Sequence, residues 1–419
     1  MYRFIKNYKQ IKSSKDGKML LANFGYLSLL QIAGYIFPLV TLPYLARVIG
    51  VDSFGKIAFA SAVVVWFQTV ADWGFNYTAT RDVAQNREDN EKVSEIFSNV
   101  FWARIALMLL SLCLLLVVIA VVPKFNENST LILLTFLMVP GGIMFPDWFF
   151  QAMERMKYIT ILNLLSKTLF TIAIFVFIKQ KSDFILQPLI TSLGSVVSGI
   201  IAMYFIIGRW GVKLHKPQLK PIVQTIKGST NMFLNNFVPN LYNSFSIMLL
   251  GFFGGSISNG LLDAGTKFVD TSQQFMNVIG RAFFPFLSRK INQHNEFVKI
   301  NIYLSLLISS LLFLLSPIII KMFYTSEFYQ SINILRFLSI TIFLMSIRNA
   351  YGTHYMVLKG YDKELWFLTF WSSIFGFLLA FPLVYYFDYW GAAINILLIK
   401  SIMAFTVVIK AKNIKKEIA

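Results

Sequence analysis

Twelve stretches of about 20 mostly apolar residues follow one another along the chain. A helix needs about 20 such residues to cross the hydrocarbon core of a bilayer. Charged residues make up only 14% of the chain, against roughly 25% in soluble domains. The sequence therefore predicts an all-α integral membrane protein. We place its transmembrane helices near residues 20–48, 55–75, 98–122, 130–152, 158–178, 185–208, 229–253, 257–287, 298–320, 333–358, 364–386 and 390–410.

Basic residues are distributed unevenly over the segments between these stretches. With a cytoplasmic N-terminus, the cytoplasmic segments hold 25 lysines and arginines and the opposite loops hold 4. Loops rich in Lys and Arg stay on the cytoplasmic side of a membrane. We therefore expect both termini in the cytoplasm. The same bias explains most of the net charge of +18, so this charge does not indicate a nucleic-acid partner.

The residue types that usually carry catalysis, metal binding or nucleotide hydrolysis are sparse. Cys113 is the single cysteine and the three histidines are scattered, which excludes an intramolecular disulfide and argues against a metal site. The chain contains no GxxxxGK[ST] phosphate-binding loop. The predicted external loops are about ten residues or fewer, too short for the sizeable external loop on which a polysaccharide polymerase or membrane glycosyltransferase usually depends. We expect neither an enzyme nor a cofactor.

The longest internal cytoplasmic link divides the predicted helices into six and six. It carries two prolines and five basic residues. An even number of helices per half makes the halves parallel repeats, with a cavity between them. Gly55 and Gly260 open the second helix of each half in similar sequences. The expected parts are a basic tail (1–19), an N-terminal six-helix bundle (20–208), a linker (209–228), a C-terminal six-helix bundle (229–410) and a cytoplasmic tail (411–419).

The predicted helix 257–287 carries a polar face. Its polar residues follow spacings of 4, 3, 4, 3 and 4 positions, which places them on one side of a helix. They are Asp263, Lys267, Asp270, Gln274, Asn277 and Arg281. Each charge facing lipid would cost about 2.5 kcal/mol or more, so this face must meet protein or water. A water-filled translocation cavity and internal pairing of Lys267 with its two acidic neighbours both explain the pattern.

Counted over all the predicted helices, the intramembrane charges are nine basic and three acidic. At an effective dielectric constant of about 20 and a separation of about 5 Å, each charge pair contributes roughly 3 kcal/mol. A cationic interior therefore suits an anionic cargo. Arg47, Arg104 and Arg336 lie near helix ends, where extension of the side chain to the membrane surface is the simpler explanation.

These patterns select two groups of candidate site residues. The residues expected to line a cavity and bind the cargo are Arg47, Lys167, Lys267, Arg281, Arg348, Lys400, Asn236, Asn240 and Gln274. The acids that could carry a coupled ion are Asp72, Asp263 and Asp270. The sequence does not indicate which of these basic residues binds the cargo.

Three motifs resemble those of the O-antigen and polysaccharide repeat-unit flippases of the Wzx type. The first is Pro43-Tyr-Leu-Ala-Arg-Val-Ile-Gly50, followed by Phe54-Gly55. The second is Asp72-Trp-Gly-Phe-Asn-Tyr-Thr-Ala-Thr-Arg81, and the third is Pro146-Asp-Trp-Phe-Phe-Gln-Ala-Met-Glu-Arg155-Met-Lys-Tyr158. In the C-terminal half, Pro285-Phe-Leu-Ser-Arg289 matches mainly by pattern.

The resemblance implies membership of the multidrug/oligosaccharidyl-lipid/polysaccharide exporter superfamily, with two six-helix bundles in a V around a central cationic cavity. It implies transfer of an undecaprenyl-pyrophosphate-linked oligosaccharide to the periplasmic leaflet of the bacterial inner membrane. The implied partners are this glycan, membrane lipids, and the polysaccharide polymerase and chain-length machinery. An ion-coupled multidrug antiporter and a lipid II flippase are the alternatives. The basic interior opposes cationic drugs, and a lipid II flippase normally has helices beyond twelve.

Overall fold

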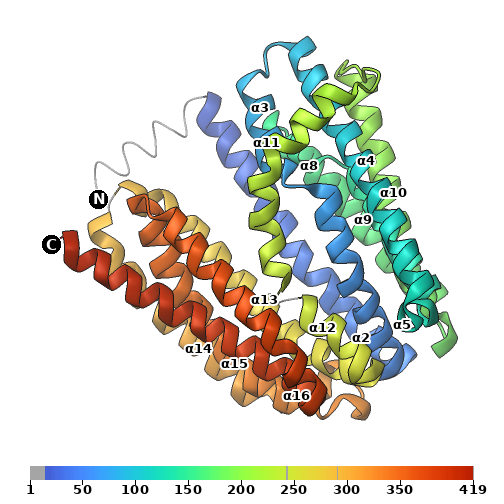
Figure 1. The fold of residues 1–419 in the computed structure, drawn as a ribbon, viewed down its shortest axis with the longest axis vertical. Helices are drawn as coiled ribbons and strands as arrows, with labels where there is room; N and C mark the ends of the chain where they lie inside the picture. The colour runs from blue at the N-terminus through green and yellow to red at the C-terminus, as the bar shows by residue number, and fades with distance from the viewer. Residues whose placement is uncertain (1–14, 242–243, 290, 419) are drawn as a thin grey trace. The chain divides into compact units, whose positions relative to one another are not determined.

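The computed structural model describes residues 15–241, 244–289 and 291–418, and the regular structure in these ranges is entirely helical (Figure 1). This confirms the predicted all-α fold. Most of the predicted basic tail, residues 1–14, lies outside the described ranges, as do residues 242–243, 290 and 419. By their contacts the described residues form two compact units.

The first unit comprises the described residues up to Thr41, Phe67–Lys179 and Ile185–Leu234. Part of the long helix α2 (Lys15–Asp72) belongs to it. The other helices that contribute are α3 (Phe75–Gln85), α4 (Asn90–Val121), α5 (Pro123–Glu127), α6 (Ser129–Phe136), α7 (Met138–Met144), α8 (Asp147–Ala152), α9 (Met156–Phe177), α10 (Leu186–Met203), η2 (Tyr204–Arg209) and most of α11 (Leu219–Phe237).

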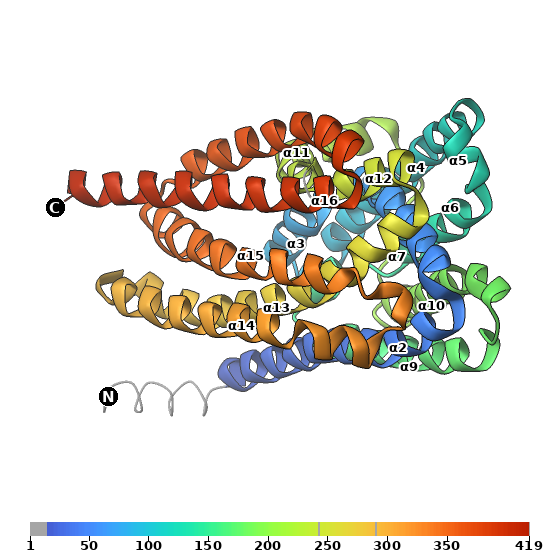
Figure 2. The same ribbon diagram turned by 90° about the horizontal axis from the view of Figure 1, so that it is seen from below.

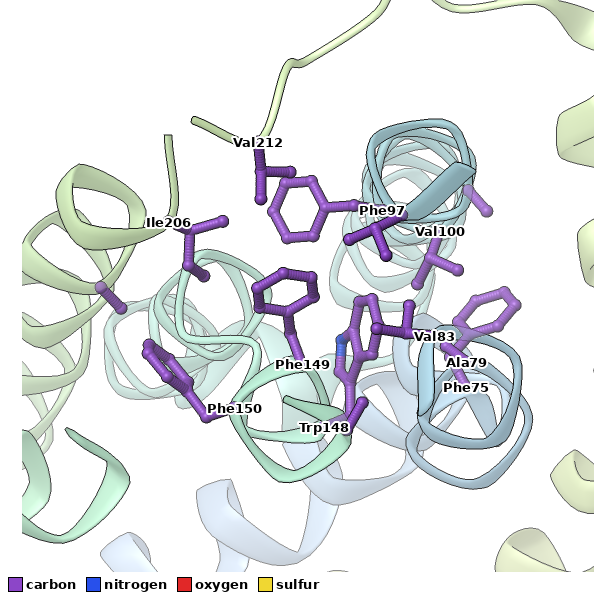
Figure 3. Packing of buried hydrophobic residues seen from close by; sticks show 14 of the residues in the cluster. Phe75, Ala79, Val83, Phe97, Val100, Trp148, Phe149, Phe150, Ile206 and Val212 are labelled. Carbon is purple, nitrogen blue, oxygen red and sulfur yellow. The ribbon is translucent and has the colours of Figure 1, made fainter. Parts of the chain in front are cut away.

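Two of the sequence motifs meet in the core of this unit. Phe75 and Ala79 of the second motif pack with Trp148 and Phe149 of the third, all fully or almost fully buried (Figure 3). The hydroxyl of Thr80 donates a hydrogen bond to the carbonyl oxygen of Trp148, at 3.3 Å. Burial of such aromatic side chains contributes about 1.5–3 kcal/mol each. These motif residues therefore hold α3 against α8.

The second unit comprises Leu42–Trp66, Gln180–Phe184 and the described residues from Asn235 onward. Its elements after residue 235 are η3 (Val238–Leu241), α12 (Ser244–Phe253), α13 (Gly255–Arg289), η4 (Ile291–Gln293), α14 (His294–Phe323), η5 (Ser326–Phe328), α15 (Ser331–Tyr351), the π-helical turn η6 (Gly352–Met356), η7 (Val357–Lys359) and α16 (Asp362–Ile418). Helices α13, α14, α15 and α16 run side by side in this unit (Figure 2).

Eight helical stretches in the described ranges are long and apolar enough to cross a membrane. Two of them each hold two predicted spans. One, which includes most of α2, is divided by Gly50, where the backbone is non-helical with φ 71°, and the other by Asp388 of α16, with φ 52°. The predicted span 229–253 is interrupted by η3, and α13 is long but rich in polar residues.

Glycine allows two helices of the second unit to touch through their backbones. A Cβ at Gly55 of α2 would collide with the carbonyl group of Ser256, and one at Gly260 of α13 with the carbonyl oxygen of Val51. Small residues permit such close approach between membrane helices. The two glycines that looked like counterparts in the two halves therefore pack against each other.

Candidate functional site

Helix α13 keeps its polar residues on one face because it runs without a break from Gly255 to Arg289. Near its start the ammonium of Lys267 lies 3.4 Å from a carboxylate oxygen of Asp263. The side chain of Lys267 is 45% exposed and that of Asp263 17%. Lys267 forms no direct ion pair with Asp270. Internal pairing therefore accounts for the first two residues of the polar face and not for the rest.

The next part of this face lines a cavity of about 450 Å³ within the second unit, which we call the Lys400 cavity. Lys400 of α16 is only 7% exposed, and Asp270 of α13 lies on the same cavity. The remaining polar lining consists of three carboxamides and three hydroxyls, from Gln273, Gln274, Asn277, Ser244, Thr266 and Thr341. The cavity thus combines one positive charge, one negative charge and neutral polar groups.

A second cavity, of about 290 Å³, follows along α13, and we call it the Arg281 cavity. Its polar lining comes from Arg281 and Asn277 of α13, Asn301 of α14, Ser346 and Asn349 of α15, and Thr353 and His354 of η6. Arg281 is exposed, and none of the described residues provides it with a carboxylate partner. The side-chain amide of Asn349 donates a hydrogen bond to the side-chain oxygen of Asn277, at 3.0 Å.

Asn277 lines both cavities. With a rise of 1.5 Å per residue, Asp270 and Arg281 lie about 10 Å and about 6 Å from Asn277 along α13, on opposite sides. The two cavities therefore follow each other along one helix. One carries an unpaired guanidinium, and the other is balanced in charge.

His354 joins two elements at the Arg281 cavity. Its ring nitrogens lie 2.9 Å from the carbonyl oxygen of Asn349 and 2.8 Å from that of Gly280. The side chain is buried, so η6 is held against α13. No periodicity in the sequence indicates this histidine, because its partners are backbone carbonyl groups and one of them, at Gly280, is 74 residues away. Asn301 and Asn349 are likewise cavity residues that the sequence did not indicate.

Arg348 is placed beside the Arg281 cavity rather than on it. Its guanidinium donates hydrogen bonds to the side-chain oxygen of Asn349, at 3.0 Å, and to the hydroxyl of Thr369, at 2.9 Å. Because Asn349 lines the cavity, Arg348 helps to orient a lining residue.

The structure disperses the remaining predicted cargo residues. Arg47 is exposed on α2, Asn236 is half-buried on α11, and Asn240 is half-buried in η3. Lys167 is half-buried on α9, where its ammonium lies 3.5 Å from the position that a Cβ on Gly34 would take. None of these four lines either cavity described above. Their role in binding the cargo stays a prediction, as does a central cavity between the predicted halves.

Asp72 has a buried partner in the first unit. Arg104 of α4 is 5% exposed and donates a short hydrogen bond to the Asp72 carboxylate. The prediction that Arg104 extends toward the membrane surface is therefore wrong, because its side chain turns inward to a carboxylate. The carboxylate of Asp147 is close enough to interact electrostatically with both groups. Asp72 is thus already engaged in an ion pair.

The described part of the chain contains no evident metal-binding site. No three His, Cys, Asp or Glu side chains there gather closely enough to hold a metal ion. The chemistry of the two cavities is therefore that of charges, amides and hydroxyls.

Several long apolar helices, together with polar cavities between helices of the second unit, define a polytopic membrane protein. A solved structure of the lipid II flippase MurJ, in an inward closed conformation, superposes with a TM-score of 0.72 at 16% identity, over 94% of this chain and 87% of that one. An inward-facing multidrug resistance MATE family transporter of the MOP superfamily gives a TM-score of 0.66 at 14% identity, over 95% of this chain and 100% of that one. At these identities the likeness establishes the fold.

The family follows from the sequence. The family described as "Polysaccharide biosynthesis protein" matches residues 20–291. A protein of Escherichia coli (strain K12) named "Putative O-antigen transporter" is 28% identical over 404 residues, which cover 94% of this chain and 97% of that protein. A Shigella dysenteriae protein of the same name is 27% identical over 90% of this chain and 96% of that protein. The chain belongs to the polysaccharide biosynthesis protein family.

Proposed function

We propose that the protein is a flippase of the bacterial inner membrane. Its cargo is an undecaprenyl-pyrophosphate-linked oligosaccharide, an O-antigen or a related surface polysaccharide unit, which it moves from the cytoplasmic to the periplasmic leaflet by alternating access. The polysaccharide polymerase and chain-length machinery act on the product. The family and the relatives named as O-antigen transporters support this proposal.

The observation that carries the proposal is the environment of Arg281. An exposed guanidinium faces a cavity whose other polar lining consists of amides, hydroxyls and a histidine, with no carboxylate. Arginine binds phosphate through two parallel hydrogen bonds, and the neighbouring amides can donate further hydrogen bonds to the phosphate oxygens. A cationic drug would be repelled at this cavity, which disfavours the antiporter alternative.

Substitution of Arg281 tests the proposal. We expect Arg281→Gln to reduce surface polysaccharide about tenfold or more in a strain that lacks the native gene, because a hydrogen bond to a charged group contributes about 1.5–3 kcal/mol. Immunoblotting should show unchanged amounts of protein in the membrane. Lys181→Gln, at an exposed site that lines neither cavity, is the matched control. Equal losses in the two variants at equal expression would contradict a role for Arg281 in binding the cargo.

Orientation in the membrane is a second prediction. A reporter inserted at the exposed Ser182 should be detected in the periplasm, and one at the exposed Gln218 in the cytoplasm, because the basic segments are retained inside. Paired alkaline phosphatase and green fluorescent protein fusions measure both positions. A cytoplasmic signal at Ser182 would contradict the proposed topology.

The driving force is a third prediction. A pyrophosphate diester carries about two negative charges, and a potential of 100 mV is worth about 2.3 kcal/mol per charge, so export gains roughly 4–5 kcal/mol. We expect transport of a lipid-linked oligosaccharide in proteoliposomes to accelerate under a potassium-diffusion potential. The carboxylate of Asp263 is already engaged by the ammonium of Lys267, at 3.4 Å. Transport that responds to a pH gradient and does not respond to the potential would overturn this expectation.

A further inference from the structure

The lining of the Lys400 cavity suits neither a cation nor an anion. Lys400 is only 7% exposed, yet it lines a cavity of about 450 Å³. Among the described residues no side chain or carbonyl accepts a hydrogen bond from its ammonium. Asp270 lies on the same cavity and interacts electrostatically with Lys400, but the two do not form a direct ion pair. Both charges therefore line one space that a ligand can occupy.

The two charges select against ions of either sign. A cation would be repelled by Lys400. It would also meet only a single carboxylate, which is too few ligands, because Ca²⁺ requires six or more oxygen ligands. An anion attracted by Lys400 would be repelled by Asp270. The volume also exceeds that of an ion site and falls in the range of about 300–1,000 Å³ that is typical of small-molecule sites.

Hydroxyl groups satisfy both charges at once. A hydroxyl accepts a hydrogen bond from an ammonium and donates one to a carboxylate. The carboxamides of Gln273, Gln274 and Asn277 each offer a donor and an acceptor to further hydroxyls. The aliphatic side chains of Leu338 and Ile396 lie on the same cavity and can pack against C–H groups. A neutral, polyhydroxylated ring fits this combination of groups.

We propose that the Lys400 cavity is a sugar-binding subsite, in which Lys400 and Asp270 are bridged by hydroxyls of an uncharged sugar of the cargo. This inference rests on the proposed function. The shared residue Asn277 makes the subsite contiguous with the Arg281 cavity. One lipid-linked molecule can then place its phosphate at Arg281 and its first sugar at Lys400. The two cavities divide recognition of the cargo into an anionic part and a neutral part.

Binding of two defined lipids to the purified full-length protein in nanodiscs tests the subsite. One probe is undecaprenyl pyrophosphate, and the other is the same lipid with one N-acetylhexosamine. We expect the wild-type protein to bind the glycosylated probe at least tenfold more tightly, which corresponds to ~1.4 kcal/mol. Lys400→Met and Asp270→Asn should each abolish most of this difference and leave the affinity for undecaprenyl pyrophosphate unchanged.

Two further variants distinguish the sugar subsite from the phosphate site. Arg281→Gln should weaken binding of both probes and preserve their ratio. Lys412→Met, an equivalent substitution at an exposed position of the same helix, should alter neither. Asp270→Asn is close to isosteric, so it tests the subsite even if Lys400→Met does not fold.

The outcomes separate the two proposals. Equal affinity of the wild-type protein for both probes, or an unchanged tenfold preference in Asp270→Asn, would overturn the sugar subsite and leave the flippase proposal intact. Failure of the wild-type protein to bind either probe would contradict the proposed function itself.

Discussion

Arg104→Met should lower the free energy of unfolding by about 3 kcal/mol, because it leaves the half-buried carboxylate of Asp72 without its buried partner. Arg104 is 5% exposed and pairs with Asp72. Asp147, which interacts electrostatically with Arg104, would lose the same compensation. Unfolding of the purified protein, followed by intrinsic tryptophan fluorescence in a denaturant titration, measures the change.

A second substitution separates an unpaired charge from lost packing. In the double variant Arg104→Met with Asp72→Leu, the charged partner is also removed, and we expect recovery of more than half of the lost stability. Arg81→Met is the control. The side chain of Arg81, which pairs with Asp82, is 64% exposed, and surface ion pairs contribute only about 0–1 kcal/mol. Additive losses in the double variant would contradict a coupled buried pair.

Gly260→Leu should prevent accumulation of folded protein. The Cβ of any other residue would enter the space occupied by the carbonyl oxygen of Val51, and Gly55 lies in the same contact. Backbone atoms cannot move aside as a side chain can, so α13 would have to separate from α2 and lose the packing between them. Size-exclusion chromatography of a fluorescent fusion, solubilised in mild detergent, should show aggregate in place of a monodisperse peak.

Gly142→Leu provides the comparison for this substitution. Gly142 is also helical, but no atom outside the adjacent backbone of its own helix lies within 4 Å of the position that its Cβ would take. We expect this variant to elute as the wild type does. A monodisperse Gly260→Leu protein would show that the contact between the two glycines is not required for folding.

The sequence motifs proved more informative about packing than about chemistry. Asp72-Trp-Gly and Pro146-Asp-Trp belong to the motifs that resemble the flippases, yet their aromatic residues lie in or against the core of the first unit. Trp73 stacks on Phe233 with ring centroids 4.0 Å apart. The residues that line the two cavities of the second unit, in contrast, come largely from α13, α15, α16 and η6, outside these motifs.

Local periodicity accounts for the features that the sequence predicted well. A helix repeats every 3.6 residues whatever its surroundings, so the spacing of Asp270, Gln274, Asn277 and Arg281 places them on one face before any packing is known. The length of each apolar stretch predicts the spans in the same way, because the thickness of the bilayer sets the length of a helix that crosses it. The all-α fold and the polar face of α13 were therefore determined by the sequence alone.

Only the tertiary structure decided which polar groups meet. Lys400 lies 130 positions after Asp270, and Arg104 lies 32 positions after Asp72, so no helical repeat relates them. The contacts of the His354 ring nitrogens with two backbone carbonyl groups leave no trace in the pattern of side chains. Burial turned one arginine that was predicted to lie near the membrane surface into half of an ion pair. Packing divided the predicted polar face of α13 into a paired segment, a charge-balanced cavity and a cavity whose guanidinium has no carboxylate partner among the described residues. Long-range packing fixes these neighbours, because the free energy of a buried charge depends on which partners the fold brings within reach.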